Sequence, residues 1–326
     1  MGEFSSLRLS PRPEIDTLSA LAKPRNKFLD KLQYLALRYV SMTLHCWPIS
    51  VNYYLANIVG DVMYFVDKRH RKLAMTNLRH SFPDKSDREL EAITRESMRQ
   101  LICLGIDVLW STRLVHVDNF EKYVELGEFR ETVRLMVSDH KGMILITGHY
   151  GNWELLGYLL ATLGFPTMSV ARPLDNQYIN HWLMSVRENR GQKIIAKKGA
   201  TDIVTATLAA QGMVGFTADQ DAGVKGLFVD FFGRKASAYK SIGLLAMQYE
   251  VPVVVGYARR VAGQGFRFRV GTQDVIHPKD WQDHPEPLMY ITQRYTKAIE
   301  QFVRDDPGQY LWIHRRWKSR PKGELP

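Results

Sequence analysis

Cysteine is scarce in this chain, and its first residues do not resemble a secretion signal. The two cysteines among 326 residues, Cys46 and Cys103, lie in apolar stretches without a Cys-x-x-Cys pair or neighbouring histidines. This scarcity argues against a disulfide framework or a structural zinc site, and it favours a reducing compartment. Because no charged start precedes a short apolar run and an Ala-x-Ala site, we expect no cleavable signal peptide. Residues 1–27, which include three prolines, are expected to form a flexible leader.

The motifs of several common enzyme classes are absent as well. The chain contains no Gly-x-Ser-x-Gly elbow, no His-Glu-x-x-His pair and no Gly-x4-Gly-Lys-Ser/Thr loop. Gly263-Gln264-Gly265 is not followed by a third glycine at the position that dinucleotide binding requires. These absences argue against a serine hydrolase of that type, a helical zinc protease, a P-loop nucleotidase and a dinucleotide-dependent enzyme.

Positive charge, by contrast, is abundant. The formal net charge is +10, while hydrophobic residues make up 45% of the chain, enough for a large core. The charge reflects either a lysine-rich surface or an acidic partner, which would be a protein, an anionic lipid or a nucleic acid. Basic residues cluster at 68–72 and again at 314–322. The first cluster directly follows an apolar segment, as expected where a chain touches a membrane surface.

That apolar segment, residues 39–60, contains no Asp, Glu, Lys or Arg. It reaches the length of about 20 residues that a membrane-spanning helix needs. Pro48 would break or kink such a helix, so we expect two amphipathic helices instead, at 29–46 and 49–66. Aromatic side chains are dense here, and such rings favour the membrane interface. Residues 28–75 therefore form either a membrane-associating helical region or a helical hairpin packed on the main domain.

From residue 130 onward, short apolar runs alternate with amphipathic stretches. We expect strands at Met143–Thr147, Thr167–Ala171, 194–195, Met213–Thr217 and 251–257, and helices at 152–163, 176–190, 200–211, 237–249 and 285–304. Residues 266–270 alternate like an added antiparallel strand, and a Ser86–Glu89 capping box begins an earlier helix. This succession predicts an α/β fold with a mixed, largely parallel central sheet flanked by helices. We expect it to form one catalytic domain over residues 76–322.

A buried strand runs into a glycine-flanked turn and then a helix at Gly148-His149-Tyr150-Gly151-Asn152-Trp153-Glu154. Catalytic groups commonly lie at the carboxyl ends of strands in such sheets. On one continuous helix, His149 and Glu154 would point about 140° apart, so they meet only if His149 precedes the helix. Glu154 would then hold one imidazole nitrogen while the other accepts a proton from a hydroxyl. Alternatively, His149 is a turn residue and Glu154 a helix-start carboxylate favoured by the helix dipole.

This run resembles the His-x4-Asp/Glu block of the glycerolipid and lipid A acyltransferase superfamily. Four further blocks are similar to those of the bacterial lipid A biosynthesis acyltransferases of the lauroyl/myristoyl type. They are Arg172-Pro173-Leu174-Asp175-Asn176, Thr217-Ala218-Asp219-Gln220-Asp221, residues 228–233 and residues 312–321. The resemblance covers residues 55–321 and implies an O-acyltransferase. Its fatty acyl donor would be acyl carrier protein, less often coenzyme A, and its acceptor a hydroxyl of a phosphorylated glucosamine lipid. It implies no other cofactor and no metal.

The resemblance also implies His149 and Glu154 as the catalytic pair. The substrate-binding candidates are Asn152, Arg172, Arg187, Arg190, Asp219, Asp221, Phe231 and Phe232. Arg172 would hold a phosphate or the acyl donor, or form a surface salt bridge. Arg187 and Arg190 lie near a helix end, where cations are stabilised in any case, and Arg190 is favoured as a substrate contact.

The remaining candidates have two interpretations each. Asp219 and Asp221 would orient a basic group or the sugar, or cap their loop. Phe231 and Phe232 would line the acyl channel or pack in the core, and Asp230 stands beside them where the family more often has proline. The basic run 314–322 would bind phosphate or form a solvated tail.

Chemistry and charge agree, because acyl carrier protein and phosphorylated lipids are both acidic. We expect the enzyme at the cytoplasmic face of the inner membrane, held peripherally or by a single N-terminal anchor. One alternative is a sister acyltransferase acting on another glycolipid, such as a phosphatidylinositol mannoside, or on an aminolipid. A nucleic-acid-binding protein is a second alternative, but no recognised nucleic-acid motif supports it.

Overall fold

The structure is a computed structural model that describes residues 26–138, 142–165, 167–171, 173–188, 191–196 and 199–323. The expected leader therefore lies, up to residue 25, outside the described residues. The strands are β1 (Val124–Leu126), β2 (Met143–Thr147), β3 (Thr167–Ala171), β4 (Lys193–Ala196), β5 (Met213–Thr217), β6 (Leu227–Phe231), β7 (Arg234–Ala238), β8 (Val253–Arg260) and β9 (Phe268–Ile276).

Seven of these strands form the central sheet of the described chain, in the order β1-β9-β8-β2-β5-β3-β4. Neighbours run parallel except β8 and β9, which are antiparallel. The predicted mixed, largely parallel sheet is confirmed, as is the antiparallel strand expected at 266–270. In this order β2 lies directly beside β5, which brings two distant segments of the sequence together at their carboxyl ends.

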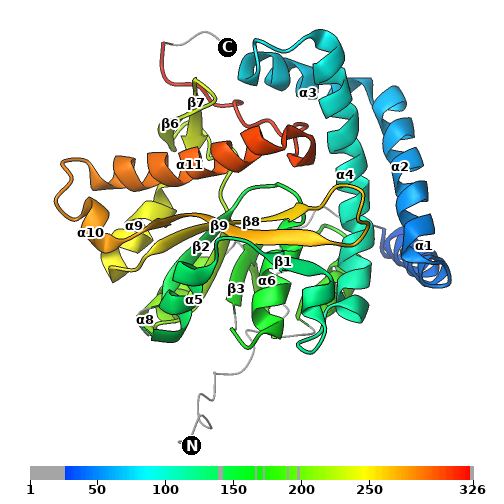
Figure 1. Ribbon diagram of the computed structural model, residues 1–326, viewed down its shortest axis with the longest axis horizontal. Coiled ribbons are helices and arrows are strands. Elements are labelled where there is room, and N and C mark those ends of the chain that lie inside the picture. The colour runs from blue at the N-terminus through cyan, green and yellow to red at the C-terminus, as the bar shows by residue number, and fades with distance from the viewer. Residues whose placement is uncertain are drawn as a thin grey trace, which may run out of the picture.

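Helices cover both faces of this sheet. They are α5 (Arg130–Ser138), α6 (Trp153–Thr162), α7 (Gln177–Arg187), α8 (Ala200–Ala209), α9 (Lys240–Tyr249), α10 (Pro278–Trp281) and α11 (Pro287–Asp305). On β2, Ile144 and Ile146 join the core that α8, α9 and α11 supply, whereas Met143 and Leu145 pack with α5 on the other face. Because both faces are covered, β2 is apolar along nearly its whole length. Helix α11 crosses the upper side of the sheet in Figure 1.

The N-terminal part is helical and confirms the break predicted at Pro48. Helix α1 (Lys27–His45) precedes it, and α2 (Ile49–Val66) begins directly after it. Helix α2 lies alongside the long helix α4 (Asp87–Leu114), with α3 (Lys68–Ser81) joining the two (Figure 1). The approach is close at Gly60, where an added Cβ would lie 2.6 Å from the Cα of Arg99.

The opposite face of α2 is apolar and exposed. Its exposed side chains are Tyr54, Leu55, Ile58, Val59, Val62, Phe65 and Val66. Among the described helices, none combines the length and the hydrophobicity needed to cross a membrane.

Local signals placed most helix ends correctly. The predicted capping box is present at the start of α4, where the Ser86 amide donates to Glu89 Oε2 at 2.8 Å and the Glu89 amide to Ser86 Oγ at 3.4 Å. Several predicted boundaries were wrong. The helix expected at 176–190 ends at Arg187, the strand expected at 266–270 spans Phe268–Ile276, and the strand expected at 251–257 spans Val253–Arg260. The helix expected from residue 237 begins at Lys240. The preceding residues belong to β7, which pairs with β6 in an unpredicted antiparallel hairpin.

Candidate active site

The turn between β2 and α6 is held on two sides by the backbone. The carbonyl oxygen of His149 accepts the Leu311 amide at 3.0 Å, and the Gly151 amide donates to the Gln309 carbonyl at 3.0 Å. From β8, the Ala258 carbonyl accepts the amide of Asn152 at 2.8 Å. Gly151 itself has a φ of +55°, a conformation that glycine adopts readily and other residues resist. The turn is therefore fixed by segments more than 100 residues away in sequence.

His149 faces the carboxylate of Asp219. Its Nδ1 lies 2.7 Å from Asp219 Oδ1, and its backbone amide donates to Oδ2 at 2.8 Å. Thr147 is paired with Thr217 in the parallel register of β2 and β5, so both side chains come two residues after paired positions. A carboxylate on Nδ1 keeps the proton there and leaves Nε2 as the acceptor. In the structure Nε2 lies 3.4 Å from the side-chain Nε2 of Gln220.

The Asp219 side chain is ionised and buried, with only 2% of the residue exposed. Burial alone would raise the pKa of this carboxyl, but the facing His149 imidazole and its hydrogen bonds outweigh burial. Together they hold the pKa of Asp219 well below its usual range. The His149 ring therefore faces a buried carboxylate that is negatively charged.

The strand–turn–helix arrangement and the family resemblance pointed to a His149–Glu154 pair, but Glu154 has a different partner. Arg187, at the end of α7, donates from Nε to Glu154 Oε2 at 2.7 Å and from Nη2 to Oε1 at 2.5 Å. Within the described residues, the carboxylate bonded to the His149 ring is thus that of Asp219. Glu154 lies in the first turn of α6, as predicted, and its side chain is directed toward α7.

His149, Glu154 and Arg187 all line one cavity of about 980 Å³. Its other walls are largely apolar and come from the sheet and its flanking helices, with Leu145, Leu156, Leu160, Val170, Ile194, Val204 and Leu245 among the lining residues. The cavity thus combines a base, an ion pair and an extended apolar surface. That combination suits a substrate with one reactive polar group and a long hydrocarbon part.

The family model of bacterial lipid A biosynthesis acyltransferases matches residues 23–319. The chain belongs to this family. It is 26% identical over 284 residues to the lipid A biosynthesis palmitoleoyltransferase of Escherichia coli K12, covering 85% of this chain and 88% of the relative. The lauroyltransferase of the same organism is 25% identical over 283 residues, with the same coverage. A lipid A biosynthesis acyltransferase of Haemophilus influenzae is 27% identical over 270 residues, covering 80% of this chain and 81% of the relative.

As a lipid A biosynthesis acyltransferase, the protein is an O-acyltransferase. The structure also locates four of its other candidate residues. Asn152 is buried as the N-cap of α6 and accepts the Leu155 amide at 2.9 Å. Asp221 caps its own loop, accepting the Gly223 amide at 3.2 Å and the Ser319 hydroxyl at 3.0 Å. Phe231 and Phe232 are buried in the main core. Of the two interpretations, packing rather than an acyl channel describes both phenylalanines.

Arg172 and Arg190 lie outside the described residues. The basic run 314–322 was expected to bind phosphate or to be solvated, and for Arg316 both expectations were wrong. Only 2% of Arg316 is exposed. Its Nη1 donates to the Ser237 carbonyl at 2.5 Å and to the Gln220 carbonyl at 3.3 Å. Burial follows no regular period in this segment, which is neither helix nor strand, so sequence alone could not separate Arg316 from exposed Arg315.

His314 was not among the predicted site residues, although it lies beside His149. Its ring packs edge-on against that of His149, with centroids 4.4 Å apart. With His149 and Asp219 it forms a group whose ligand atoms lie within 4.8 Å of one another, close enough to share a metal ion. Burial, and to a lesser extent the neighbouring His149, lower the pKa of His314 to about 4. The ring is therefore neutral near pH 7.

This low pKa makes stability depend on pH. Between pH 7 and 5 the unfolded His314 ring binds a proton and the folded ring does not, so the free energy of unfolding should fall by roughly 2 kcal/mol from this residue. His314→Gln should remove that component, measured as a smaller loss between urea unfolding at pH 7 and pH 5. His181→Gln, at an exposed position of α7, is the matched control and should keep the wild-type loss. Equal losses in wild type and His314→Gln would contradict the prediction.

Proposed function

We propose that this lipid A acyltransferase moves a fatty acyl chain from an acyl carrier protein thioester, or from coenzyme A, to a hydroxyl of a lipid A precursor. That acceptor is a phosphorylated glucosamine lipid. The observation that carries the proposal is the His149–Asp219 pair in the wall of a large, mainly apolar cavity. The relatives named palmitoleoyltransferase and lauroyltransferase support a fatty acyl chain as the transferred group.

In the proposed reaction His149 is the general base. Its Nε2 takes the proton of the acceptor hydroxyl as the oxygen attacks the thioester carbonyl carbon, and Asp219 stabilises the resulting imidazolium. Collapse of the tetrahedral intermediate breaks the carbon–sulfur bond and forms the ester. The imidazolium then returns its proton to the departing thiolate. No covalent acyl-enzyme is needed, which agrees with the absence of a nucleophile elbow in the sequence.

Glu154 remains in the proposal as the second carboxylate of the site. Arg187 donates to both carboxylate oxygens of Glu154. The two side chains therefore form a fixed ion pair in the wall of the cavity. The guanidinium can contact a phosphate or the thioester oxygen, and the carboxylate can accept a sugar hydroxyl. In this arrangement Asp219 orients His149, and Glu154 orients the substrate beside it.

The surface suggests where the acceptor is reached. We assign residues 28–75 as the membrane-associating region, because the exposed apolar face of α2 leads directly into the basic start of α3. Lys68, Arg71 and Lys72 line a groove there together with Tyr64 and Phe65. Cations beside an apolar helix face suit the surface of an anionic bilayer. We therefore propose a peripheral position at the cytoplasmic face of the inner membrane, where an acidic acyl carrier protein would also be accessible.

Mass spectrometry of lipid products tests the proposal directly. The purified protein is incubated with lauroyl, myristoyl or palmitoleoyl thioesters of acyl carrier protein or coenzyme A, and with a tetra-acylated lipid A precursor. The expected result is a mass gain of one fatty acyl group on that precursor. A phosphatidylinositol mannoside and an aminolipid serve as competing acceptors. A gain on one of these and none on the lipid A precursor would overturn the proposed acceptor.

A further inference from the structure

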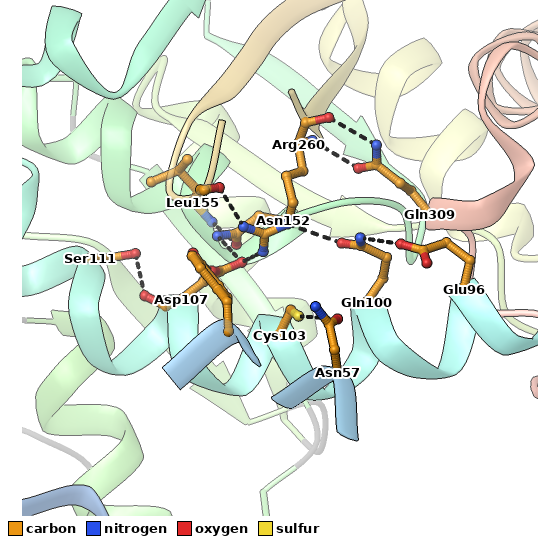
Figure 2. Close-up of polar contacts among 12 residues, drawn as sticks. Asn57, Glu96, Gln100, Cys103, Asp107, Ser111, Asn152, Leu155, Arg260 and Gln309 are labelled. Atoms are coloured by element: carbon orange, nitrogen blue, oxygen red, sulfur yellow. Dashed lines mark hydrogen bonds and ion pairs between the residues drawn. The ribbon is translucent and has the colours of Figure 1, made fainter. Parts of the chain in front are cut away.

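A buried polar cluster lies behind the turn that carries His149, and its members are not among the described residues that line the cavity. Its centre is Asp107 of α4, with Tyr53 of α2, Asn152 of the turn and Arg260 at the end of β8. Figure 2 shows these contacts, with Arg260 and Asn152 converging on the Asp107 carboxylate. The cluster connects four segments that are otherwise far apart in sequence.

Asp107 uses both of its oxygens, although only 1% of the residue is exposed. Oδ1 accepts the Tyr53 hydroxyl at 2.5 Å, and Oδ2 accepts the Asn152 Nδ2 at 3.3 Å together with Arg260 Nη2. A carboxylate buried in this way is costly unless it is paired and fully hydrogen-bonded. Apolar side chains would fill the same space without that cost, so stability alone does not explain the choice of residues.

Arg260 is fixed as firmly as the carboxylate. Its guanidinium lies between the rings of Tyr53 and Phe268, 4.7 and 4.8 Å from their centroids, and its Nε donates to Gln100 Oε1 at 3.0 Å. Its backbone is clamped by Gln309, which accepts the Arg260 amide at 2.8 Å and donates to its carbonyl at 3.0 Å. The same Gln309 offers its own carbonyl to the Gly151 amide. The cluster thus reaches the turn at two adjacent residues, Gly151 and Asn152.

The Asn152 side chain shows what the cluster determines. Its Oδ1 must accept the Leu155 amide to cap α6, and its Nδ2 therefore points to Asp107. Without the Asp107 carboxylate, Nδ2 of this buried side chain loses its partner, and only the cap to Leu155 still holds the Asn152 side chain. Because Asn152 lies between His149 and the first turn of α6, loosening it lets the turn move the base relative to Glu154.

We propose that Asp107, held by Arg260 and Tyr53, is a positioning residue for acyl transfer that acts through Asn152 on the His149 turn. Tyr53 extends this connection to α2, whose outer face is exposed and apolar. A test that measures the rate of acyl transfer depends on the proposed function being correct. A test that measures the exchange of backbone amides does not depend on it.

Two substitutions separate positioning from packing. Asp107→Asn replaces one acceptor oxygen by an NH2 group at constant shape, and Asn152→Ser keeps a good N-cap while removing the contact with Asp107. Each is expected to lower kcat by roughly 10- to 100-fold, because small displacements of reacting groups have effects of that size. KM for both substrates should stay within about twofold of wild type, since the cavity is not changed. The double variant should be no slower than the slower single variant, because both act through one contact.

The matched control is Thr94→Val, which removes a buried hydroxyl from the same helix. Thr94 is fully buried and donates to the Leu90 carbonyl at 2.8 Å, with no contact to the turn. Hydrogen–deuterium exchange of a peptide spanning residues 148–156 should rise by about tenfold in Asp107→Asn and stay unchanged in Thr94→Val. If Asp107→Asn does not fold, Tyr53→Phe and Asn152→Ser provide the same comparison with a single bond lost in each.

The outcomes are distinct. Wild-type exchange in the 148–156 peptide of these variants, or independent and multiplicative losses of kcat in the double variant, would overturn the positioning role. A wild-type enzyme that transfers no acyl group would instead overturn the proposed function, while the exchange result would still decide the role of Asp107.

Discussion

Asp219→Asn is expected to lower the rate of acyl transfer by about 10³- to 10⁴-fold while the protein stays folded. Asparagine has one acceptor oxygen where Asp219 now serves two donors, the backbone amide of His149 and its ring Nδ1. If the oxygen keeps the amide, the asparagine NH2 faces Nδ1 and forces the ring proton onto Nε2. The nitrogen that should accept the hydroxyl proton is then occupied. Initial rates of lipid acylation measure this loss, with circular dichroism to verify the fold.

Glu154→Gln is the matched comparison, because it removes the same charge from the other carboxylate of the site. We expect it to weaken acyl transfer through its ion pair with Arg187, but to leave the His149 ring hydrogen bond intact. A strongly deshielded Nδ1 proton in the NMR spectrum should therefore persist in Glu154→Gln and vanish in Asp219→Asn. If the Nδ1 proton signal is lost in Glu154→Gln and kept in Asp219→Asn, then Glu154 and not Asp219 orients the His149 ring.

The largest effect on stability is expected for Gly151→Ala. An added Cβ would lie 2.1 Å from the carbonyl oxygen of Ala258, a backbone atom that also accepts the Asn152 amide. The φ of +55° at Gly151 adds strain for any residue with a side chain. We expect a loss of at least about 4 kcal/mol, a value typical of severe disruption and comparable to the whole stability of many domains.

Gly164→Ala is the control for the backbone contribution alone. Gly164 has a φ of +89°, and an added Cβ there would meet no atom within 4 Å. Its cost should be about 1–2 kcal/mol, the usual price of a left-handed conformation in a residue with a side chain. Urea unfolding of both variants measures the difference. Equal losses would show that the contact with Ala258 is relieved by a small movement, against our expectation.

Much of the fold follows from local patterns. The continuous apolar runs at β2 and β5 predict buried parallel strands, and Pro48 and the Ser86–Glu89 box mark helix ends that the structure confirms. The β6–β7 hairpin escaped prediction because its pairing joins a short mixed-polarity run to residues that also continue a helical pattern. Its strands form by packing against α11 and the C-terminal segment, which local propensity does not report.

Part of the candidate site also follows from local patterns, and part depends on distant contacts. A strand, a glycine-flanked turn and a helix start predict where His149 lies, because each depends on neighbours within a few residues. The partner of its ring depends instead on which strand lies beside β2, and 70 residues separate His149 from Asp219. The strand–turn–helix setting and the family resemblance pointed to Glu154, because both are read from residues close together in the sequence.

The sequence by itself determined the family, the type of fold and the turn that carries His149. Hydrophobic periodicity, turn residues and ordered motifs are local properties, and they survive without knowledge of contacts. Only the tertiary structure decided that Asp219 contacts the His149 ring, that Arg187 pairs with Glu154, and that Arg316 and Asp107 are buried. These contacts and this burial depend on the order of the strands and on the removal of charged groups from water. Both arise only when distant segments pack together.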